Sequence, residues 1–329
     1  MARRFHDVDT FAGELRGGVV AIGNFDGVHR GHQAVLARAT AISKAAGVAS
    51  IVLSFEPHPR TVFRPDQPVF RLTPAPMKAV VLGHLGFDAI VEQRFDKTFS
   101  SQSAEDFVTR TLCQRLGVHH VVTGYDFHFG KGREGNPDYL MNAGVRHGFG
   151  VTLVEQFQDE NAEVVSSSRI REALAAGDVA GANGLLGYRY AVSAEVQHGQ
   201  KLGRTLGYPT ANMALPPETA LEPGIYAVRF RRSDGTIHDG VASFGRRPTV
   251  AEAGAALLLE TFLFDFSADL YGETCTVSFV TRLRGEEKFD DLDQLVSQMK
   301  IDEAEARAAL GSLQPLSPLD AAITFGPAG

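Results

Sequence analysis

The sequence predicts an α/β protein of two domains: a parallel sheet covered by helices, followed by an antiparallel β-barrel with a terminal helix. Three observations predict this. The chain has 329 residues, which is more than one hydrophobic core usually serves. In the first half, short apolar runs alternate with amphipathic stretches. In the second half, apolar runs with partial alternation follow one another with only turns between them.

The strands expected in the first half are rich in β-branched residues and are bounded by glycine or aspartate. They cover residues 19–22, 50–55, 89–91, 120–123 and 151–154. Apolar residues recur at helical spacing over residues 33–46, 76–85, 104–116 and 138–147. Right-handed crossovers would gather the loops that follow these strands along one edge of the sheet, where ligands bind in such folds.

The change of pattern that marks the second domain comes near residue 187. A helix expected over residues 168–176 and a stretch rich in small residues, 177–187, precede it. We therefore predict a first domain over residues 1–186 and a second over 187–329. The barrel strands are expected at residues 190–196, 225–230, 237–243, 257–264 and 275–283.

One helix is expected after the barrel, from residue 292 to about 310, broken or capped near residues 301–302. The tail, residues 314–329, holds three prolines and two glycines, and we expect it to be poorly ordered.

The composition narrows the class of protein. A net charge of −7 argues against a broad nucleic-acid surface, although a local basic pocket could still hold a nucleotide. No apolar run suits a signal peptide or a membrane span, so we expect a cytoplasmic protein with neither nucleic acid nor membrane as a partner. Cys113 and Cys275 form no C-x-x-C pair and are expected to be reduced, buried thiols. The sequence leaves self-association open.

The strongest signal of the first half lies at residues 21–33, where a strand ends, a glycine-rich turn follows and a helix begins. His29 and His32 are three residues apart and can point to one face of the helix start. Free N–H groups and the helix dipole favour anions there, and histidines add hydrogen-bond donors. We interpret this as a nucleotide phosphate site, the alternative being a turn with two incidental histidines. The glycines that would let backbone approach a ligand are Gly23, Gly27 and Gly31.

Polar side chains also follow other strands of the first half. Pro57 and Pro59 stiffen a loop around His58, which could equally be a solvated loop histidine. Asp126 follows the strand at 120–123, where it could also cap a turn.

The start of the helix near residue 168 carries two serines and two arginines. Ser166 and Ser167 could cap the helix. Arg169 and Arg171 are disfavoured at a helix start unless an anion is bound, so we interpret them as phosphate contacts, with salt bridges as the alternative.

Together these segments resemble the adenylylating half of bacterial bifunctional riboflavin kinase/FAD synthetases, with its G-x-F-D-G-x-H-x-G-H signature. The resemblance implies a Rossmann-like nucleotidylyltransferase domain in which the FMN phosphate attacks the α-phosphorus of ATP, assisted by Mg²⁺, and pyrophosphate leaves. It implies that charge is stabilised by His29, His32 and Arg171, that ATP is bound by Gly23, Phe25, Asp26, Gly31, Ser166, Ser167 and Arg169, and that FMN is bound near His58, Pro59 and Asp126.

The second half is dominated by residues 198–212, a glycine-rich and basic segment that can wrap phosphates. Thr210 and Asn212 offer hard oxygen donors suited to Mg²⁺ beside substrate phosphates. The alternative is a flexible loop before a strand. The residues that would hold ATP here are Gly199, Lys201, Gly203, Arg204, Gly207 and Pro209.

The P-T-A-N motif at residues 209–212 resembles that of the riboflavin kinase family, and segments 224–228, 244–249, 259–261, 265–272 and 283–289 match in family order. The resemblance implies that Glu260 is the general base for the 5′-hydroxyl of riboflavin and that Arg284 lies near the flavin or phosphate. Each residue also has a purely structural alternative. Glu260 could lie on the exposed face of an alternating strand, and Arg284 could form a salt bridge with Glu286 or Glu287. Ser243 departs from the asparagine usual in the family, which leaves the flavin contact on its loop open.

The sequence thus predicts an enzyme that phosphorylates riboflavin to FMN and adenylylates FMN to FAD. Two alternatives are an enzyme that keeps one activity or adenylylates another phosphate ester, and a non-catalytic flavin-binding regulator. An RNA-binding barrel is disfavoured because the chain lacks a basic excess and an aromatic stacking pattern.

Overall fold

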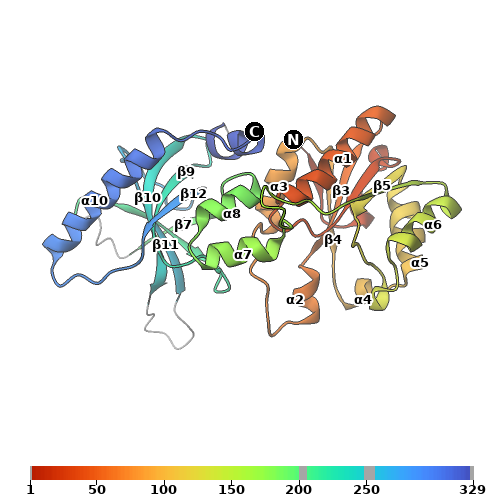
Figure 1. Cartoon of the computed structure of the whole chain (residues 1–329), viewed down its shortest axis with the longest axis horizontal. Helices are drawn as coiled ribbons and strands as arrows, with labels where there is room; N and C mark the ends of the chain where they lie inside the picture. The colour runs from red at the N-terminus through yellow and green to blue at the C-terminus, as the bar shows by residue number, and fades with distance from the viewer. Residues whose placement is uncertain (1, 200–205, 248–255, 327–329) are drawn as a thin grey trace. The chain divides into compact units, whose positions relative to one another are not determined.

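The computed structural model describes residues 2–199, 206–247 and 256–326 (Figure 1). The chain divides into two compact units, Met1–Ser166 and Ser167–Gly329. The first contains a parallel sheet with helices and the second a closed antiparallel barrel with a terminal helix, so the predicted fold class is confirmed.

The sheet of the first unit has six parallel strands in the order β1-β4-β3-β2-β5-β6. They are β1 (Arg3–Phe5), β2 (Val19–Ile22), β3 (Ser50–Glu56), β4 (Ala89–Arg94), β5 (His120–Gly124) and β6 (Gly150–Val154). Five of them were predicted; β1 is too short and too exposed to give a strand pattern.

The helices of the first unit include those that the spacing of apolar residues predicts, at 33–46, 76–85, 104–116 and 138–147, together with short ones that were not predicted. They are η1 (Val8–Thr10), η2 (Gly13–Leu15), α1 (Arg30–Ala46), α2 (Pro59–Phe63), α3 (Ala75–His84), α4 (Lys97–Ser100), α5 (Ala104–Asp106), η3 (Phe107–Leu116), η4 (Lys131–Arg133) and α6 (Pro137–His147). The helix expected over residues 104–116 begins as α5 and continues as the π-helix η3. α1 ends at Gly47, whose left-handed conformation glycine adopts readily.

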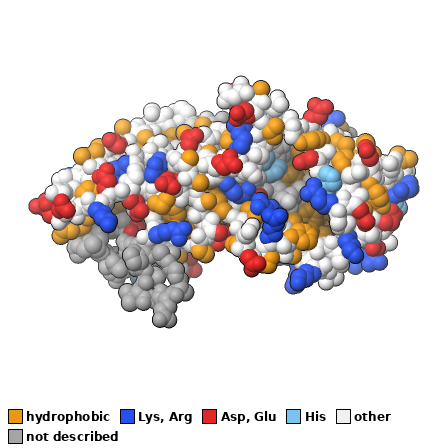
Figure 2. All heavy atoms as spheres, turned by 60° about the horizontal axis from the view of Figure 1, so that its bottom comes forward, with side chains coloured by type: hydrophobic (Ala, Val, Ile, Leu, Met, Phe, Trp, Pro, Cys, Tyr) orange, Lys and Arg blue, Asp and Glu red, His pale blue; other side chains and the backbone are white. Residues whose placement is uncertain are grey.

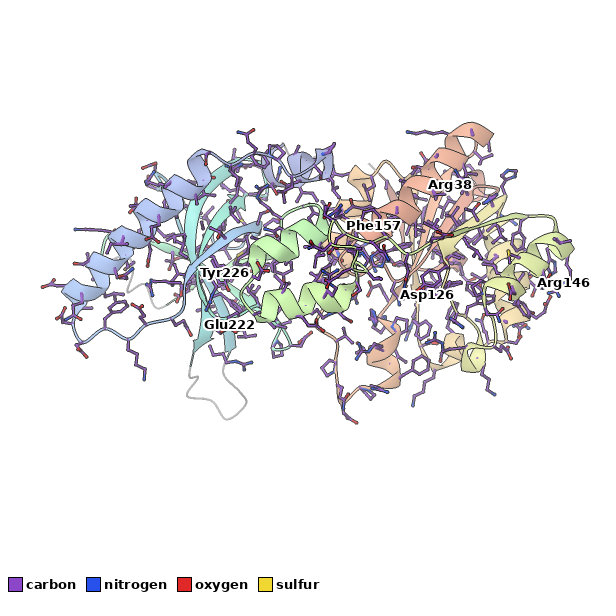
Figure 3. All side chains as sticks on the ribbon, viewed as in Figure 1. Arg38, Asp126, Arg146, Phe157, Glu222 and Tyr226 are labelled. Atoms are coloured by element: carbon purple, nitrogen blue, oxygen red, sulfur yellow. The ribbon has the colours of Figure 1, made fainter. Side chains whose placement is uncertain are left out.

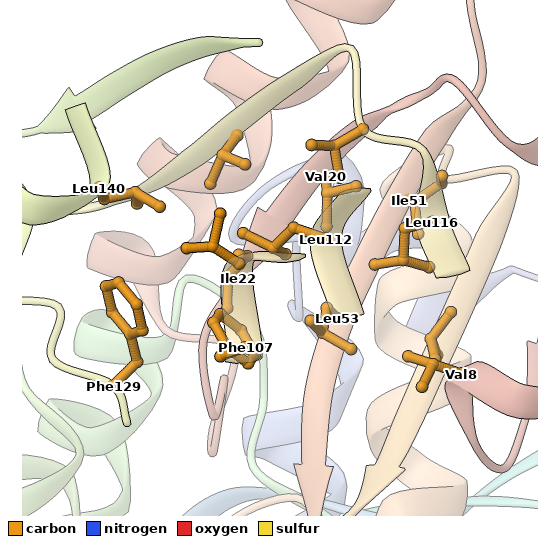
Figure 4. Close-up of a cluster of buried hydrophobic side chains, with 14 of the residues drawn as sticks. Val8, Val20, Ile22, Ile51, Leu53, Phe107, Leu112, Leu116, Phe129 and Leu140 are labelled. Atoms are coloured by element: carbon orange, nitrogen blue, oxygen red, sulfur yellow. The ribbon is translucent and has the colours of Figure 1, made fainter. Parts of the chain in front are cut away.

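The core of the first unit lies between the central strands and η3, with α6 at its edge (Figure 4). All four residues of β2 are buried, as expected for a parallel strand covered on both faces. Val20, Ile22 and Leu53 from the sheet pack with Leu112 and Phe107 from η3.

The direction in which successive strands are added to the sheet changes between β2 and β5, although all the strands stay parallel. From β2 the chain builds outward through β3 and β4, and then returns to add β5 and β6 on the other side of β2. The Thr123 hydroxyl of β5 donates to the Ile22 carbonyl of β2 at 3.1 Å. In open α/β sheets, ligands bind beyond the carboxyl ends of the strands at such a switch point.

The second unit begins with two helices, α7 (Ser167–Ala175) and α8 (Val179–Leu186). The small-residue stretch is therefore a helix; the Asp178 side chain caps it and Gly187 ends it. The Asn183 side chain of α8 donates to the Phe279 carbonyl at 3.0 Å and accepts from the Tyr190 amide at 2.8 Å. The predicted domain boundary after residue 186 separates these helices from the barrel, whereas their contacts group them with it.

The barrel closes in the order β10-β11-β8-β7-β12-β9. Its strands are β7 (Ala191–Gln197), β8 (Thr210–Leu215), β9 (Gly224–Arg231), β10 (Ile237–Arg247), β11 (Ala256–Leu263) and β12 (Thr274–Arg284). β8 was not among the predicted strands. Its residues Thr-Ala-Asn-Met-Ala-Leu contain one β-branched residue, so its strand character comes from pairing with β11 and β7.

The terminal helix α10 (Leu292–Gly311) is continuous, so the break predicted near residues 301–302 is wrong. Asp302 is polar yet buried because its carboxylate pairs with Arg284 of β12, at 2.8 and 2.7 Å. The ion pair of Asp302 with Arg284 therefore explains why a charged residue interrupts the apolar pattern of a continuous helix.

The C-terminal segment also differs from the prediction. Residues 314–326, expected to be poorly ordered, contain α11 (Pro318–Asp320) and η5 (Ala321–Phe325) and pack on the second unit. Asp320 is fully buried, accepts from the backbone amides of Arg189 and Leu316 at 3.0 and 2.9 Å, and pairs with the Arg189 guanidinium. The Arg229 guanidinium lies 4.4 Å from the Phe325 ring centroid.

The surface carries both signs of charge. On the face that Figure 2 shows, acidic and basic side chains are interspersed over both units. Among the described residues, none of the helices combines the length and hydropathy needed to span a bilayer. Both cysteines are free thiols, Cys275 buried and Cys113 partly so, and burial raises the pKa of each, to about 11 for Cys275.

Candidate active sites

The two histidines of the first motif lie together at the start of α1. His29 is the N-cap residue, and its Nδ1 accepts from the His32 amide at 3.3 Å. The two imidazoles stack with centroids 3.7 Å apart, and the Phe25 ring meets His32 edge-on at 5.3 Å. The predicted pairing of the two side chains on one face is therefore present in the structure.

Two glycines of this turn make room for aromatic rings. A Cβ atom at Gly31 would lie 3.2 Å from the His29 ring, and one at Gly23 would lie 2.9 Å from the Phe25 ring. Gly27 has a φ of +87°, and Phe25 and Val28 also have positive φ, of 48° and 38°. Positive φ is unfavourable for a side-chain-bearing residue, so the surroundings must hold this loop in place.

A cluster of charged residues that the sequence analysis did not identify lies beneath the loop. Arg71 donates to both carboxylate oxygens of Glu56, at 2.9 and 2.8 Å, and Lys78 Nζ donates to Glu56 at 2.7 Å. Arg71 also contacts Asp26 at 3.4 Å. Lys78 is fully buried and Asp26 is 2% exposed. A buried lysine is stable only with partners, and here Glu56 supplies its charge partner.

The charges of this cluster shift the pKa values of its members and of His32. Burial opposes ionisation of Glu56, but the hydrogen bond from Arg71 and the charge of Lys78 lower its pKa to about 2. Burial lowers the pKa of Lys78, against the pull of Glu56. Burial, His29 and Lys78 together lower the pKa of His32 well below its ordinary value. His32 is therefore a neutral imidazole at neutral pH.

The residues predicted to contact FMN lie on two loops at the same sheet edge. His58 caps α2, because its Nδ1 accepts from the Arg60 amide at 3.2 Å, and Pro59 is the first residue of that helix. Asp126 is exposed in the loop after β5 (Figure 3). These loops follow β3 and β5, the two neighbours of β2 in the sheet.

A series of aromatic rings in contact follows the same edge, and the sequence analysis did not identify it. It begins at Phe63 of α2, which is 64% exposed and lies 5.7 Å from Phe95. It continues through Phe55, Phe99, Phe107 and Phe129 to Phe127 and Tyr139. These residues come from different helices, strands and loops of the first unit, so only the fold brings them together.

The serine–arginine segment begins at the boundary between the units. Ser166 ends the first unit, and Ser167 begins α7, whose first turns carry Arg169 and Arg171. The residue before Ser166 lies beside the first motif: the Val165 carbonyl oxygen is 3.4 Å from the position of a Cβ atom at Gly31.

In the second unit, strand register brings the predicted residues into one row. Glu260 of β11 lies opposite Asn212 of β8 on one side and opposite Ser243 of β10 on the other. Paired residues of an antiparallel sheet share a face, so the three side chains are neighbours. The residues that follow or precede them in their strands, Thr261 and Ala242, are fully buried and point to the opposite face.

Asn212 is held at the start of β8. Its Nδ2 donates to the Thr210 carbonyl at 3.0 Å and lies 3.4 Å from the Thr210 hydroxyl. Within the part of the chain that the structure describes, the buried Oδ1 of Asn212 has no hydrogen-bond partner. A Cβ atom at Gly199 would lie 2.6 Å from this side chain, so Gly199 passes directly beside it.

The main ion pair of Arg284 is not the expected one with Glu286 or Glu287. Arg284 binds Asp302 with both nitrogens of its fork, and Glu287 is farther away at 3.9 Å. Arg284 therefore fastens α10 to β12.

The other residues predicted to bind ATP in the second unit fall into two groups: those close in sequence to Thr210 and Asn212, and those outside the residues that the structure describes. Lys201, Gly203 and Arg204 belong to the latter. Gly207 and Pro209 are exposed, and between them Tyr208 packs edge-on against Phe262 at 4.8 Å. Among the residues in the described ranges, no group of three or more histidine, cysteine or acidic side chains could hold a metal ion.

The two parts of the chain match two different transferase families. Residues 12–169 match the family model for FAD synthetase, and residues 186–310 match that for riboflavin kinase. A bifunctional riboflavin kinase/FMN adenylyltransferase of Pseudomonas fluorescens is 44% identical over 295 residues, which cover 90% of this chain and 94% of the relative. The one of Escherichia coli K12 is 39% identical over 299 residues, 91% of this chain and 95% of the relative.

Among solved structures, a protein of Streptococcus pneumoniae described as a macrolide-efflux protein is similar, with a TM-score of 0.81 and 29% identity. The match covers 93% of this chain and 98% of that one. The chain belongs to the family of bifunctional riboflavin kinase/FMN adenylyltransferases, which confirms the predicted family.

Proposed function

We propose that the chain converts riboflavin to FMN in its second unit and FMN to FAD in its first, with ATP as co-substrate in both steps. The observation that supports this most is the match of each unit to a different family model, together with a separate polar site in each unit. The product of the second unit is then the substrate of the first.

In the first unit, ATP phosphates would bind at the start of α1, where free N–H groups and the helix dipole favour anions. A phosphate oxygen of FMN attacks the α-phosphorus of ATP, and the bond to pyrophosphate breaks. Such a transfer needs alignment and charge stabilisation more than a strong base. His29 and His32 supply the stabilisation, and Ser166 adds a contact to ATP. Ser167, Arg169 and Arg171, which the family resemblance adds to this set, belong to the second unit.

His32 suits this role because of its protonation state. A neutral imidazole has one N–H donor, and the buried Nδ1 of His32 has no partner among the described residues. Placed beside the loop, it can donate to phosphate oxygen as charge develops without burying a fixed charge beforehand.

FMN would lie along the carboxyl edge of the sheet, near His58, Pro59 and Asp126. The aromatic series offers flat apolar surface at the same edge, starting with the exposed Phe63. Aromatic rings pack well against one another in offset or edge-on arrangements, which suits the flavin ring system.

In the second unit, the 5′-hydroxyl oxygen of riboflavin attacks the γ-phosphorus of ATP, and ADP leaves. Glu260 accepts the hydroxyl proton as a general base. The chain segment that contains Gly199, Lys201, Gly203, Arg204, Gly207 and Pro209 would hold the ATP phosphates. Arg284 would contribute near the flavin or phosphate from its place between β12 and α10.

The residues Thr210 and Asn212 fit a Mg²⁺ ion. Their oxygens are hard donors, and the unpartnered, buried Oδ1 of Asn212 is a group that a cation would satisfy. Since no acidic cluster is present among the described residues, most of its charge balance would come from the ATP phosphates. When bound, Mg²⁺ supplies neutralisation of phosphate charge.

The first test changes Glu260 to Gln in the full chain. FMN formation from riboflavin and ATP should fall by about 10²- to 10⁴-fold, because the general base is removed while the side-chain shape is kept. FAD formation from supplied FMN should be unchanged. Separation of the flavins by chromatography measures both rates. Glu195→Gln, at an exposed position of β7, is the matched control and should change neither rate.

The second test is the reciprocal variant His32→Ala. FAD formation from FMN and ATP should fall by about 10²- to 10³-fold, since one hydrogen-bond donor to the reacting phosphate is lost. FMN formation should be retained, and His119→Ala, at an exposed position of the first unit, should be silent. If either variant abolished both activities while remaining folded, the assignment of one reaction to each unit would be wrong.

A further inference from the structure

The phosphate loop of the first unit is anchored at three of its residues by one short segment, residues 71–78. Lys78 Nζ donates to the Asn24 carbonyl at 3.2 Å. Asp26 accepts from the Thr73 amide at 3.1 Å and contacts Arg71 at 3.4 Å. The Gly27 amide donates to the Thr73 hydroxyl at 2.8 Å.

This anchor is a charge-balanced cluster in which Lys78 and Asp26 are buried and Glu56 and Arg71 are partly buried. Two carboxylates, Asp26 and Glu56, face two cations, Arg71 and Lys78. Glu56 lies at the end of β3 and binds both cations, so it fixes the segment 71–78 to the sheet as well as to the loop. Because each charge is paired, the cluster can stay buried beneath a loop that has to receive phosphates.

The anchored residues alternate with strained ones. Phe25 and Val28 have positive φ, and the anchors at Asn24, Asp26 and Gly27 lie before and between them. A strained conformation persists only where its surroundings determine it. The ring of Phe25 in turn meets His32, so the conformation of the loop is transmitted to the imidazole.

We propose that Lys78, together with Arg71 and Thr73, positions the loop and His32 for adenylyl transfer without touching the substrates. Lys78 holds the Asn24 carbonyl away from the incoming phosphates and presents its charge to the His29–His32 pair from below. This inference rests on the proposed function of the first unit and adds three positioning residues to it.

The experiment compares Lys78→Met with wild type in the full chain. Methionine fills the same buried space but cannot bind the Asn24 carbonyl. We expect kcat for FAD formation to fall by about 100-fold, the effect of misplacing reacting groups by about an ångström, while the KM for ATP changes by less than about threefold. FMN formation in the second unit should stay within about twofold of wild type. Lys44→Met, at an exposed position of α1, should change neither activity.

A second readout separates positioning from a general loss of packing. The imidazole of His32 can be titrated by NMR in protein with labelled histidine. Removing the charge of Lys78 should raise the pKa of His32, because that charge, with burial and His29, holds it low. Lys44→Met should leave the titration unchanged.

Thr73→Val provides the milder variant, because it removes only the hydroxyl that accepts from Gly27. We expect FAD formation to fall by about tenfold with FMN formation intact, the size of effect that one lost hydrogen bond produces. If Lys78→Met does not fold, Thr73→Val decides: full FAD formation in the folded protein would overturn the proposal.

The outcomes also distinguish the positioning role of Lys78 from the proposed function of the first unit. If His32→Ala loses FAD formation but Lys78→Met keeps a rate within about threefold of wild type, a difference well below that of a misplaced reacting group, the positioning role is wrong and the site assignment stands. If His32→Ala itself retains FAD formation, the assignment of the first unit's site fails.

Discussion

The two units use buried charge in different places. In the first unit, Lys78 is fully buried beneath the loop of the candidate site, and its neighbours Glu56 and Arg71 are partly buried. In the second unit, the fully buried carboxylate of Asp320 pairs with Arg189 and fastens the C-terminal segment, while the row Asn212–Glu260–Ser243 belongs to barrel strands. A loop needs such anchors to keep one conformation, whereas side chains on paired strands are already held by the ladder. We therefore expect loss of these charges to affect chemistry as well as stability in the first unit, and stability alone in the second.

The largest expected effect on stability is that of Asp320→Ala. It leaves the Arg189 guanidinium buried and unpaired, which costs about 3–5 kcal/mol. Urea unfolding of the full chain, followed with a probe in the second unit, measures the loss. Asp290→Ala, an exposed position, is the control. At a temperature where the variant is folded, FMN formation should match wild type; a specific loss of kcat would show that the tail contributes to the kinase site.

A smaller effect concerns the acid stability of the first unit. The pKa of Glu56 in the folded chain is about 2, against an ordinary value of 4.5. Because the folded value is the lower one, the contribution to stability is complete above pH 4.5 and is lost as pH falls toward 2. The difference corresponds to about 3 kcal/mol.

Glu56→Gln should remove this part of the pH dependence. Urea unfolding between pH 7 and pH 3, followed with a probe in the first unit, should show wild type and variant converging as the pH falls. Glu155→Gln, at an exposed site, should follow wild type throughout. If the free energies of unfolding of wild type and Glu56→Gln changed in parallel with pH, the ion pairs of Glu56 would not contribute to stability as expected.

The smallest expected effect concerns the metal in the second unit. Asn212→Ala should raise the Mg²⁺ concentration needed for half-maximal FMN formation by about 10- to 100-fold. The Mg²⁺ dependence of FAD formation should not change, because it belongs to the other unit. Equal Mg²⁺ curves for wild type and variant in FMN formation would remove Asn212 from the metal site.

The sequence predicted the parts of both sites that lie in one continuous segment. The turn at residues 21–33 and the row member Glu260 could be found because the relevant residues share a short motif or interrupt an apolar run. Arg71 and Lys78 could not, because only the fold brings them to Glu56. The same holds for the aromatic series and for Asp302, whose partner Arg284 is 18 residues away.

The fold was predictable where local patterns are strong and failed where tertiary contacts decide. Strand β8 has little strand propensity of its own and is specified by its neighbours. The C-terminal segment has the composition of a disordered tail, yet Asp320 finds Arg189 at a separation of 131 residues. Neither the pairing of β8 nor the contact between Asp320 and Arg189 can be recognised from a short stretch of the sequence.

That separation sets practical limits for cutting the protein into parts. A recombinant second unit that ended with α10 would leave the Arg189 guanidinium without its carboxylate partner, and one that began at the barrel would lack the α8 asparagine that bonds the Phe279 carbonyl. Gene fragments for this half should therefore start before α7 and run past Phe325, and an affinity tag at the C-terminus needs a spacer.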